Sequence, residues 1–199
     1  MGLRATFAQF RGQTFGWTTE KLEVAQGRER ATGLAGRNLY EYDLRLADLH
    51  KTDLYYANLK RANMQGANLR GANMERANMQ GANMERANLF RTVLCWAKLQ
   101  GANLESAYLE KANMQGAHLQ GVNFGNADLQ GAIFENANMQ GAIFEYAKLQ
   151  GADLTCAKGV THEQLKKAYI DATTTLPSYI KPSIVTSRPQ QTLSAPAPA

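Results

Sequence analysis

The stretch ANMERANMQGANMERANLF, residues 72–90, repeats a five-residue word: Ala, then Asn, then Met or Leu, then two polar or small residues. We call the Leu, Met or Phe in the middle of each word its centre. Centres occur every five residues from Leu39 to Leu154, which gives 24 consecutive words with 15 Leu, 6 Met and 3 Phe centres. The residue two positions before the centre is Ala in 19 of them. A repeat this regular indicates a regular shape.

A period of five fits neither a helix nor a long strand. On a helix of 3.6 residues per turn, each word would rotate the apolar stripe by about 140° and spread it over every side. On a straight strand, an odd period would send successive centres to opposite faces. A short strand followed by a corner removes both difficulties, because the centre and the residue two before it then point inward together. Glycines two positions after the centre support such a corner, since tight turns often need φ > 0 there: Gly66, Gly71, Gly81, Gly101, Gly116, Gly121, Gly131, Gly141 and Gly151.

A chain that bends the same way every five residues winds into a coil, and one coil cannot bury its own apolar face. The words in RANMQGANLRGANMERANMQGANMERANLF, residues 61–90, resemble those of the pentapeptide-repeat family, and the match extends over residues 37–157. The resemblance implies an all-β solenoid, a right-handed quadrilateral β-helix with twenty residues per coil. About six coils at roughly 4.8 Å each would form a rod about 29 Å long. Arg37, Tyr42 and Thr52 stand where Ala is usual, so the first coil is expected to be irregular.

The segments on either side of residues 37–157 differ in composition from the repeats. Residues 1–36 contain apolar side chains suited to an N-terminal cap or extension. Residues 158–182 are expected to form a C-terminal helical cap, because THEQLKKAYIDA, residues 161–172, predicts a helix with Thr161 as N-cap and Gln164 completing a capping box. Residues 183–199 are rich in Pro, Ser, Thr and Ala and are predicted to be disordered.

The net charge of +5 belongs to the flanks, because residues 37–157 hold twelve Lys/Arg and twelve Asp/Glu. A neutral repeat domain makes nucleic acid an unlikely partner. The sequence contains no run of 18 apolar residues, so no transmembrane segment is predicted. The only two cysteines, Cys95 and Cys156, lie about three coils apart and are predicted to be free thiols, which favours a reducing, cytoplasmic location.

Catalysis needs converging groups with reactive protonation states, and the sequence shows no such constellation. The three histidines, His50, His118 and His162, fall far apart in the coil frame, so neither a metal site nor a cofactor is predicted. The Asp and Asn residues before the centres recur too regularly for a catalytic array. They are predicted to bond with nearby backbone and to stack between coils. The chain is therefore not expected to be an enzyme.

Residues twenty positions apart should stack on the outside of the rod. One such column carries Gln80, Gln100, Gln120 and Gln140, each followed by Gly, and predicts a flat surface with an amide ladder. The monotony breaks at FRTVLCW, residues 90–96. Tyr56, Arg76 and Trp96 form one outward column there, which would place the guanidinium between two rings. The candidate partner-binding patch is Tyr55, Tyr56, Arg76, Phe90, Val93, Cys95, Trp96 and Tyr108.

These observations favour a non-enzymatic scaffold or regulator that presents a rigid face to a protein partner. The alternative for the patch is that its side chains stack on one another and only stiffen the rod. Some members of the family that the repeats resemble protect DNA gyrase by imitating duplex DNA, but a mimic of a polyanion should be acidic and this repeat domain is neutral. Binding of nucleic acid or a membrane surface through the basic flanks is a third hypothesis. The similarity of QGA linkages and of AKGVTHEQLKKA, residues 157–168, to cyanobacterial and chloroplast members names no partner and no oligomeric state.

Overall fold

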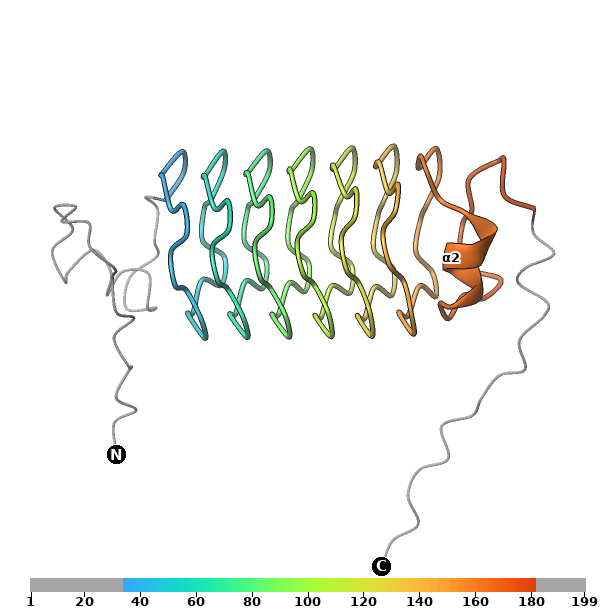
Figure 1. Ribbon diagram of the computed structural model, residues 1–199, viewed down its shortest axis with the longest axis horizontal. Helices are drawn as coiled ribbons and strands as arrows, with labels where there is room; N and C mark the ends of the chain where they lie inside the picture. Colours follow the sequence, from blue (N-terminus) through green and yellow to red (C-terminus); the bar gives the residue numbers. More distant parts are fainter. Residues whose placement is uncertain (1–33, 182–199) are drawn as a thin grey trace, which may run out of the picture.

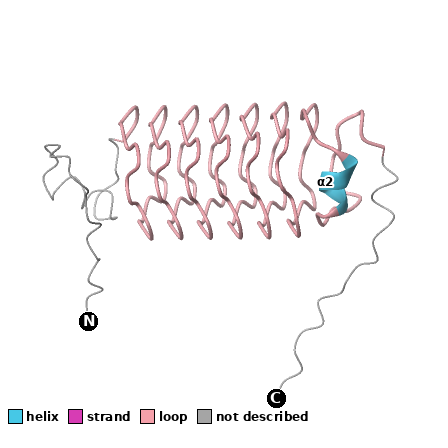
Figure 2. Ribbon diagram, viewed as in Figure 1, coloured by secondary structure: helices cyan, strands magenta, loops and turns pink. Residues whose placement is uncertain are grey.

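A computed structural model describes residues 34–181 and shows stacked coils that form a rod ending at helix α2 (Figure 1). Parallel bridges from Asn38↔Asn58 to Asn138↔Lys158 each join a residue to the one twenty positions later, so one coil contains four words. Each side of a coil contributes a single bridging residue, directly before the centre, and the coils are therefore drawn as loops (Figure 2). The predicted stacked solenoid is confirmed.

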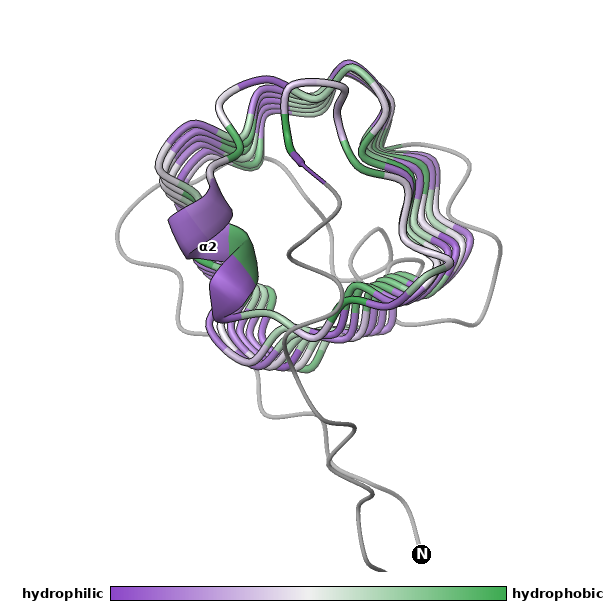
Figure 3. Ribbon diagram, turned by 90° about the vertical axis from the view of Figure 1, so that its right-hand side faces the viewer, coloured by the Kyte–Doolittle hydropathy of each residue, from purple (hydrophilic) through white to green (hydrophobic). Residues whose placement is uncertain are grey.

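The core of the rod is the predicted inward surface. The alanines from Ala57 to Ala157 and the centres from Leu49 to Leu154 are buried. Similar hydropathy recurs at the same position of successive coils when the rod is viewed along its axis (Figure 3). Phe124 stacks on Phe144 with ring centroids 5.4 Å apart, one coil away. One predicted inward column is confirmed at no more than 1 % exposure: Leu49, Leu69, Leu89, Leu109, Leu129 and Leu149.

Every corner is a tight turn that begins at the centre of a word. The amide of Ala102 donates to the carbonyl of Leu99 at 2.8 Å, and Gly101, the third residue of this turn, has φ +67°. Positive φ at the third residue is the signature of a type II turn. Non-glycine residues adopt the same conformation where they replace glycine, as at Trp96 with φ +58°. The corner is therefore imposed by the coil and not by glycine alone.

The Asn or Asp before a centre bonds within its own turn, and several of the Asn side chains also donate to the coil before it. Asn113 Oδ1 accepts the amide of Gln115 at 3.0 Å, and Asn73 Nδ2 donates to Asp53 Oδ1 at 3.1 Å. These bonds satisfy polar groups that the bend of the chain would otherwise leave open. The structural role predicted for these residues is confirmed.

The first coil follows the twenty-residue register but is less well buried than the others. Tyr42 and Leu44 are only partly buried against the core, and Leu46 is 80 % exposed at a corner. The expected irregularity thus concerns the packing, since Asp43 still pairs with Asn63. Most of the predicted N-terminal cap, residues 1–33, and the predicted disordered tail, residues 183–199, lie outside the described residues.

After the last words the chain forms α2, His162–Lys166, whose Leu165 is buried. Thr161 and Gln164 make both bonds of the capping box. The helix predicted over residues 161–172 is too long, because α2 has five residues and ends at the C-cap Lys167. The chain then returns to the coil pattern: Tyr169 pairs with Lys148, and Thr175 pairs with Asp153. Backbone pairing to the last coil therefore replaces further helix.

Candidate functional site

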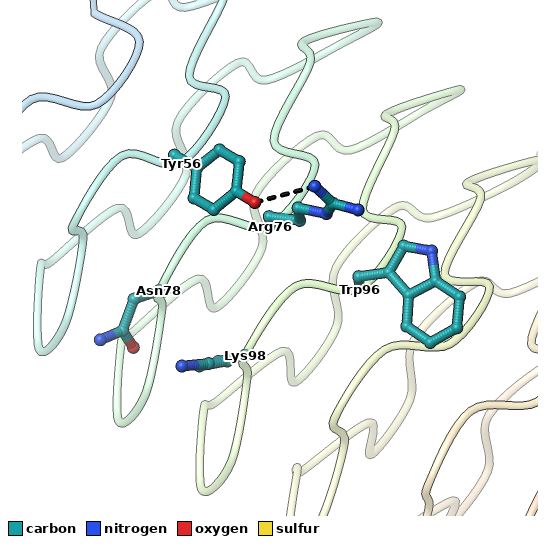
Figure 4. A pocket seen from close by; sticks show the side chains of 5 residues that line it. All are labelled: Tyr56, Arg76, Asn78, Trp96 and Lys98. Atoms are coloured by element: carbon teal, nitrogen blue, oxygen red, sulfur yellow. Dashed lines mark hydrogen bonds between the residues drawn. The ribbon is translucent and has the colours of Figure 1, made fainter.

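The outward column Tyr56, Arg76 and Trp96 lies on one corner of the rod, on three successive coils (Figure 4). Arg76 Nη1 donates to Tyr56 Oη at 2.8 Å, and its guanidinium carbon is 5.5 Å from the centroid of the Tyr56 ring. The bond to Tyr56 raises the pKa of Arg76 above its ordinary value, which keeps the group charged. Tyr55 meets Tyr56 edge to face at 4.5 Å. Arg76 is thus held in place by an aromatic pair.

Trp96 takes a direction that the sequence did not predict. A Cβ built on Gly116, one coil further on, would lie 2.5–2.7 Å from three carbons of the indole. The indole therefore lies over Gly116 and buries it, while 51 % of Trp96 stays exposed. The expectation that Arg76 sits between two rings is wrong, because within residues 34–181 its ring partner is Tyr56 alone. The missing side chain of Gly116 makes room for the indole.

A shallow pocket opens beside this corner (Figure 4). It is lined by Tyr56, Arg76, Asn78, Trp96 and Lys98. Asn78 and Lys98 were not predicted from the sequence. They form a parallel β-bridge with each other on the side that follows the corner, and their side chains point outward. The twenty-residue frame could have found them, because they follow Arg76 and Trp96 by two residues. The pocket offers two cations, two aromatic rings and one amide.

Phe90, a further residue of the candidate patch, lies on the preceding corner. The guanidinium carbons of Arg70 and Arg91 are each 5.1 Å from the centroid of its ring.

In each coil a three-residue side joins the corner of Phe90 to the corner of Trp96, and Val93 is the outward residue on that side. We call the corner with Tyr56, Arg76 and Trp96 the aromatic corner. The cation corner is the one that carries Lys51, Arg70, Arg91 and Lys111, one on each of four successive coils.

The side between these two corners, which we call the site face, has outward residues Asp53, Asn73, Val93, Asn113, Ile133 and Asp153. The structure brings Tyr55, Tyr56, Arg76, Phe90, Val93, Cys95 and Trp96 together around this face. Tyr108 is 54 % exposed but lies on the side beyond the cation corner. The predicted patch is therefore one face with two edges, and Tyr108 is outside it.

The cation corner itself was missed in the sequence. None of its four cations has an ion pair among the described residues, whereas Arg61, Arg76 and Arg86 on other corners each lie within 4 Å of a carboxylate. The sequence does contain one cation on each of four successive coils at this corner. Arg70, however, stands one position earlier in its word than Lys51, Arg91 and Lys111. A column read at a single position misses it.

The thiol at the site, Cys95, is not activated by its surroundings. Cys95 is half-buried, and burial raises the pKa of its thiol, with the charge of Glu75 raising it further. A raised pKa leaves the thiol protonated and weakly reactive. Within residues 34–181, no group of three or more His, Cys, Asp or Glu side chains could hold a metal ion. No helix in that range is long and apolar enough to cross a membrane.

Comparisons with known proteins identify the same five-residue repeat. The family model described as pentapeptide repeats matches in eight copies, over residues 34–66, 52–89, 87–126 and 117–155. No protein in a search of curated sequences matches significantly. Among solved structures, HetL, a pentapeptide repeat protein involved in heterocyst differentiation regulation in the cyanobacterium Nostoc, aligns with a TM-score of 0.51 and 24 % identity. The alignment covers 79 % of this chain and 88 % of HetL. At that identity the match shows the fold alone.

Two further structures match less well. Full-length QnrB1, a plasmid-mediated fluoroquinolone resistance protein, aligns with a TM-score of 0.49 and 13 % identity over 75 % of this chain and 86 % of its own. A pentapeptide repeat protein from the thylakoid lumen of Arabidopsis thaliana is 28 % identical over 56 % of this chain and 67 % of its own, with a TM-score of 0.29.

Proposed function

We propose, from the premise that this chain belongs to the pentapeptide-repeat family, that it is a non-enzymatic scaffold or regulator whose site face docks a protein partner. Members of this family fold as right-handed β-helix solenoids. In the proposed form, about six coils closed by the α2 segment make a stiff rod that holds its outward columns at a fixed pitch. We place it in the cytoplasm, because Cys95 and Cys156 are free thiols of the kind that a reducing compartment preserves.

The observation that carries this proposal is the aromatic corner with its pocket. Tyr, Trp and Arg are the residues that most often dominate the energy of protein–protein interfaces. Here Arg76 is already held on Tyr56, so a partner would order little that is not ordered beforehand. Preorganisation of this kind lowers the entropy lost on binding. Trp96 adds a large, half-exposed apolar surface at the edge of the pocket.

A DNA-mimicking role has less support. A polyanion mimic needs a continuous acidic surface, and residues 37–157 contain twelve cations and twelve acids. The cations of the cation corner, which have no ion pair within residues 34–181, edge the same face as the aromatic corner. A site face edged by cations is the opposite of what such a mimic would present.

The proposal is tested by recovering the partner from native extract on the wild-type chain and identifying it by mass spectrometry. Trp96→Ala and Arg76→Glu should each lose that partner while the melting temperature changes little, because an exposed cation–π pair contributes only about 0.5–1 kcal/mol. The matched control is Arg86→Glu, which reverses an exposed charge on another corner and should keep the partner. A sharp fall in melting temperature with the partner retained would show that the aromatic corner only stiffens the rod.

A further inference from the structure

We infer that a protein docked on the site face is a second copy of this chain, with two rods lying side by side and parallel. This inference rests on the proposed function and names the partner. Its starting point is the pitch of the rod: two copies have the same twenty-residue coil. When one coil of each copy is in register, the other coils are therefore in register as well.

The site face has edges of complementary chemistry. One edge is the cation corner, where Lys51, Arg70, Arg91 and Lys111 outnumber the single carboxylate Glu110. The other is the aromatic corner, where Glu75 and Glu135 outnumber the single cation Arg76. A two-fold axis parallel to the rods and lying in the contact plane places the cation corner of each copy against the aromatic corner of the other. Such an interface is isologous, so every contact at one edge recurs at the other.

Three successive coils form favourable in-register pairs. Arg70 faces the partner's Glu75, an ion pair across the interface. Arg91 faces the partner's Trp96, a cation–π pair. Lys111 faces the partner's Gln115, whose amide oxygen can accept a hydrogen bond. Cations without an ion pair inside the described chain thus acquire partners in the second copy.

The charges also select the direction of the rods. A two-fold axis perpendicular to the rods would make them antiparallel and set each cation corner against itself, with Arg70 facing the partner's Arg91. Like charges placed opposite each other in an interface oppose association. In parallel rods each cation corner instead meets the corner with Glu75, whose carboxylate lies 3.8 Å from Arg76 Nε of its own copy.

The middle of the site face is compatible with close approach. Val93 and Ile133 are β-branched residues that point outward there, and Ile133 is 37 % exposed. The like-charged positions near the axis are Asp53 and Asp153, at the two ends of the face. Each already accepts a backbone amide of its own turn, from Tyr55 and Thr155 respectively. These internal bonds orient both carboxylates toward their own turns.

The size of the face sets the expected affinity. The site face is five intervals of about 4.8 Å long, and its three-residue side with one corner residue at each edge is at most about 17 Å wide. The contact is therefore on the order of 400 Å² per copy. Specific interfaces bury roughly 1,000 Å² or more in total. The dimer should therefore be weak, with a dissociation constant in the micromolar range or above.

The test is charge reversal followed by mixing, read by sedimentation equilibrium over a concentration series of the full chain. Arg70→Glu sets a carboxylate against the partner's Glu75 at both edges, and Glu75→Arg sets two cations together. Each variant alone should dimerise at least tenfold more weakly than wild type, which corresponds to about 1.4 kcal/mol. An equimolar mixture should regain the wild-type constant, because each edge of the mixed dimer then pairs opposite charges.

The matched control is Lys60→Glu, a charge reversal on a corner outside the site face, which should leave the dissociation constant unchanged. Circular dichroism checks that each variant keeps the wild-type fold. A wild-type chain that stays monomeric at millimolar concentration, or a mixture that fails to regain association, overturns the inference. If the wild type stays monomeric and Trp96→Ala still releases a different protein in the extract experiment, the second copy is excluded while the proposed function stands. If both Trp96→Ala and Arg76→Glu retain that protein, the proposed function fails.

Discussion

Two corners of the rod share one backbone and carry opposite surfaces. The Gln–Gly corner repeats Gln80, Gln100, Gln120 and Gln140, each followed by glycine, whereas the aromatic corner carries Tyr56, Arg76 and Trp96. Their turns are closed by the same bond, from Ala102 to Leu99 at 2.8 Å and from Ala97 to Leu94 at 3.1 Å. The predicted amide ladder has one direct rung within the described chain, from Gln80 to Gln100. The Gln–Gly corner is flat, whereas large side chains project from the aromatic corner.

The difference shows what the fold demands and what it leaves open. Gly101 and Trp96 have φ of +67° and +58°, so the coil imposes the left-handed conformation on either residue. That conformation costs a residue with a side chain roughly 1–2 kcal/mol and costs glycine little. The aromatic corner therefore carries side chains at a conformational cost that the Gln–Gly corner avoids. The same left-handed conformation occurs at Arg61, Arg86 and Tyr146 on other corners, so the strain does not single out the aromatic corner.

The largest expected effect comes from the interior on which both corners rest. Leu109→Asp should unfold or aggregate the protein, because an unpaired buried charge costs several kcal/mol, on the order of the whole stability. The measurement is circular dichroism with thermal melting. The matched control is Tyr108→Asp, which introduces the same residue one position earlier at a site that is 54 % exposed and should leave the fold intact. A soluble, normally melting Leu109→Asp variant would contradict the twenty-residue register.

The interior and the corners were predictable because the same word is repeated along the chain. A shift of register by one residue would expose every centre, so the burial of Leu109 follows from counting. The positive φ at Gly101 follows from the same count, as do the bonds of Asn113. Each local preference in these words agrees with the global shape.

Features that depend on one side chain were not predictable in the same way. The period says that Trp96 points outward but not whether its indole leans toward Arg76 or toward Gly116. The answer depends on the space that a missing Cβ leaves one coil away. The length of α2 was also missed, because Tyr169 gains backbone bonds to Ala147 and Leu149 that a longer helix would forgo. The direction of the indole and the length of α2 each depend on two competing sets of contacts, and the five-residue repeat does not indicate which set is more stable.

The second prediction compares glycines on the two corners. Gly101→Ala should cost about 1 kcal/mol, because its φ is +67° and a Cβ there meets nothing within 4 Å. Gly116→Ala should cost more, since its Cβ would also displace the indole of Trp96. The measurement is the denaturant midpoint of each variant. In a Trp96→Ala background the two alanine substitutions should become equally costly, and a difference that persists would show that Trp96 is not what fills the space over Gly116.

The smallest effects concern glycine placed at non-glycine corners. Arg86→Gly removes a left-handed arginine with φ +56° and should stabilise the chain by several tenths of a kcal/mol, because relief of the backbone exceeds the extra entropy of the unfolded chain. Trp96→Gly gains the same relief but loses the contact of the indole with Gly116, so its net change should be a loss of up to about 1 kcal/mol. Chemical denaturation of both variants measures the difference between the corners. Trp96→Gly should also weaken self-association, whereas Arg86→Gly should leave it unchanged. Equal stabilisation by the two substitutions would mean that the indole contributes nothing to the fold and that the aromatic corner is retained for binding alone.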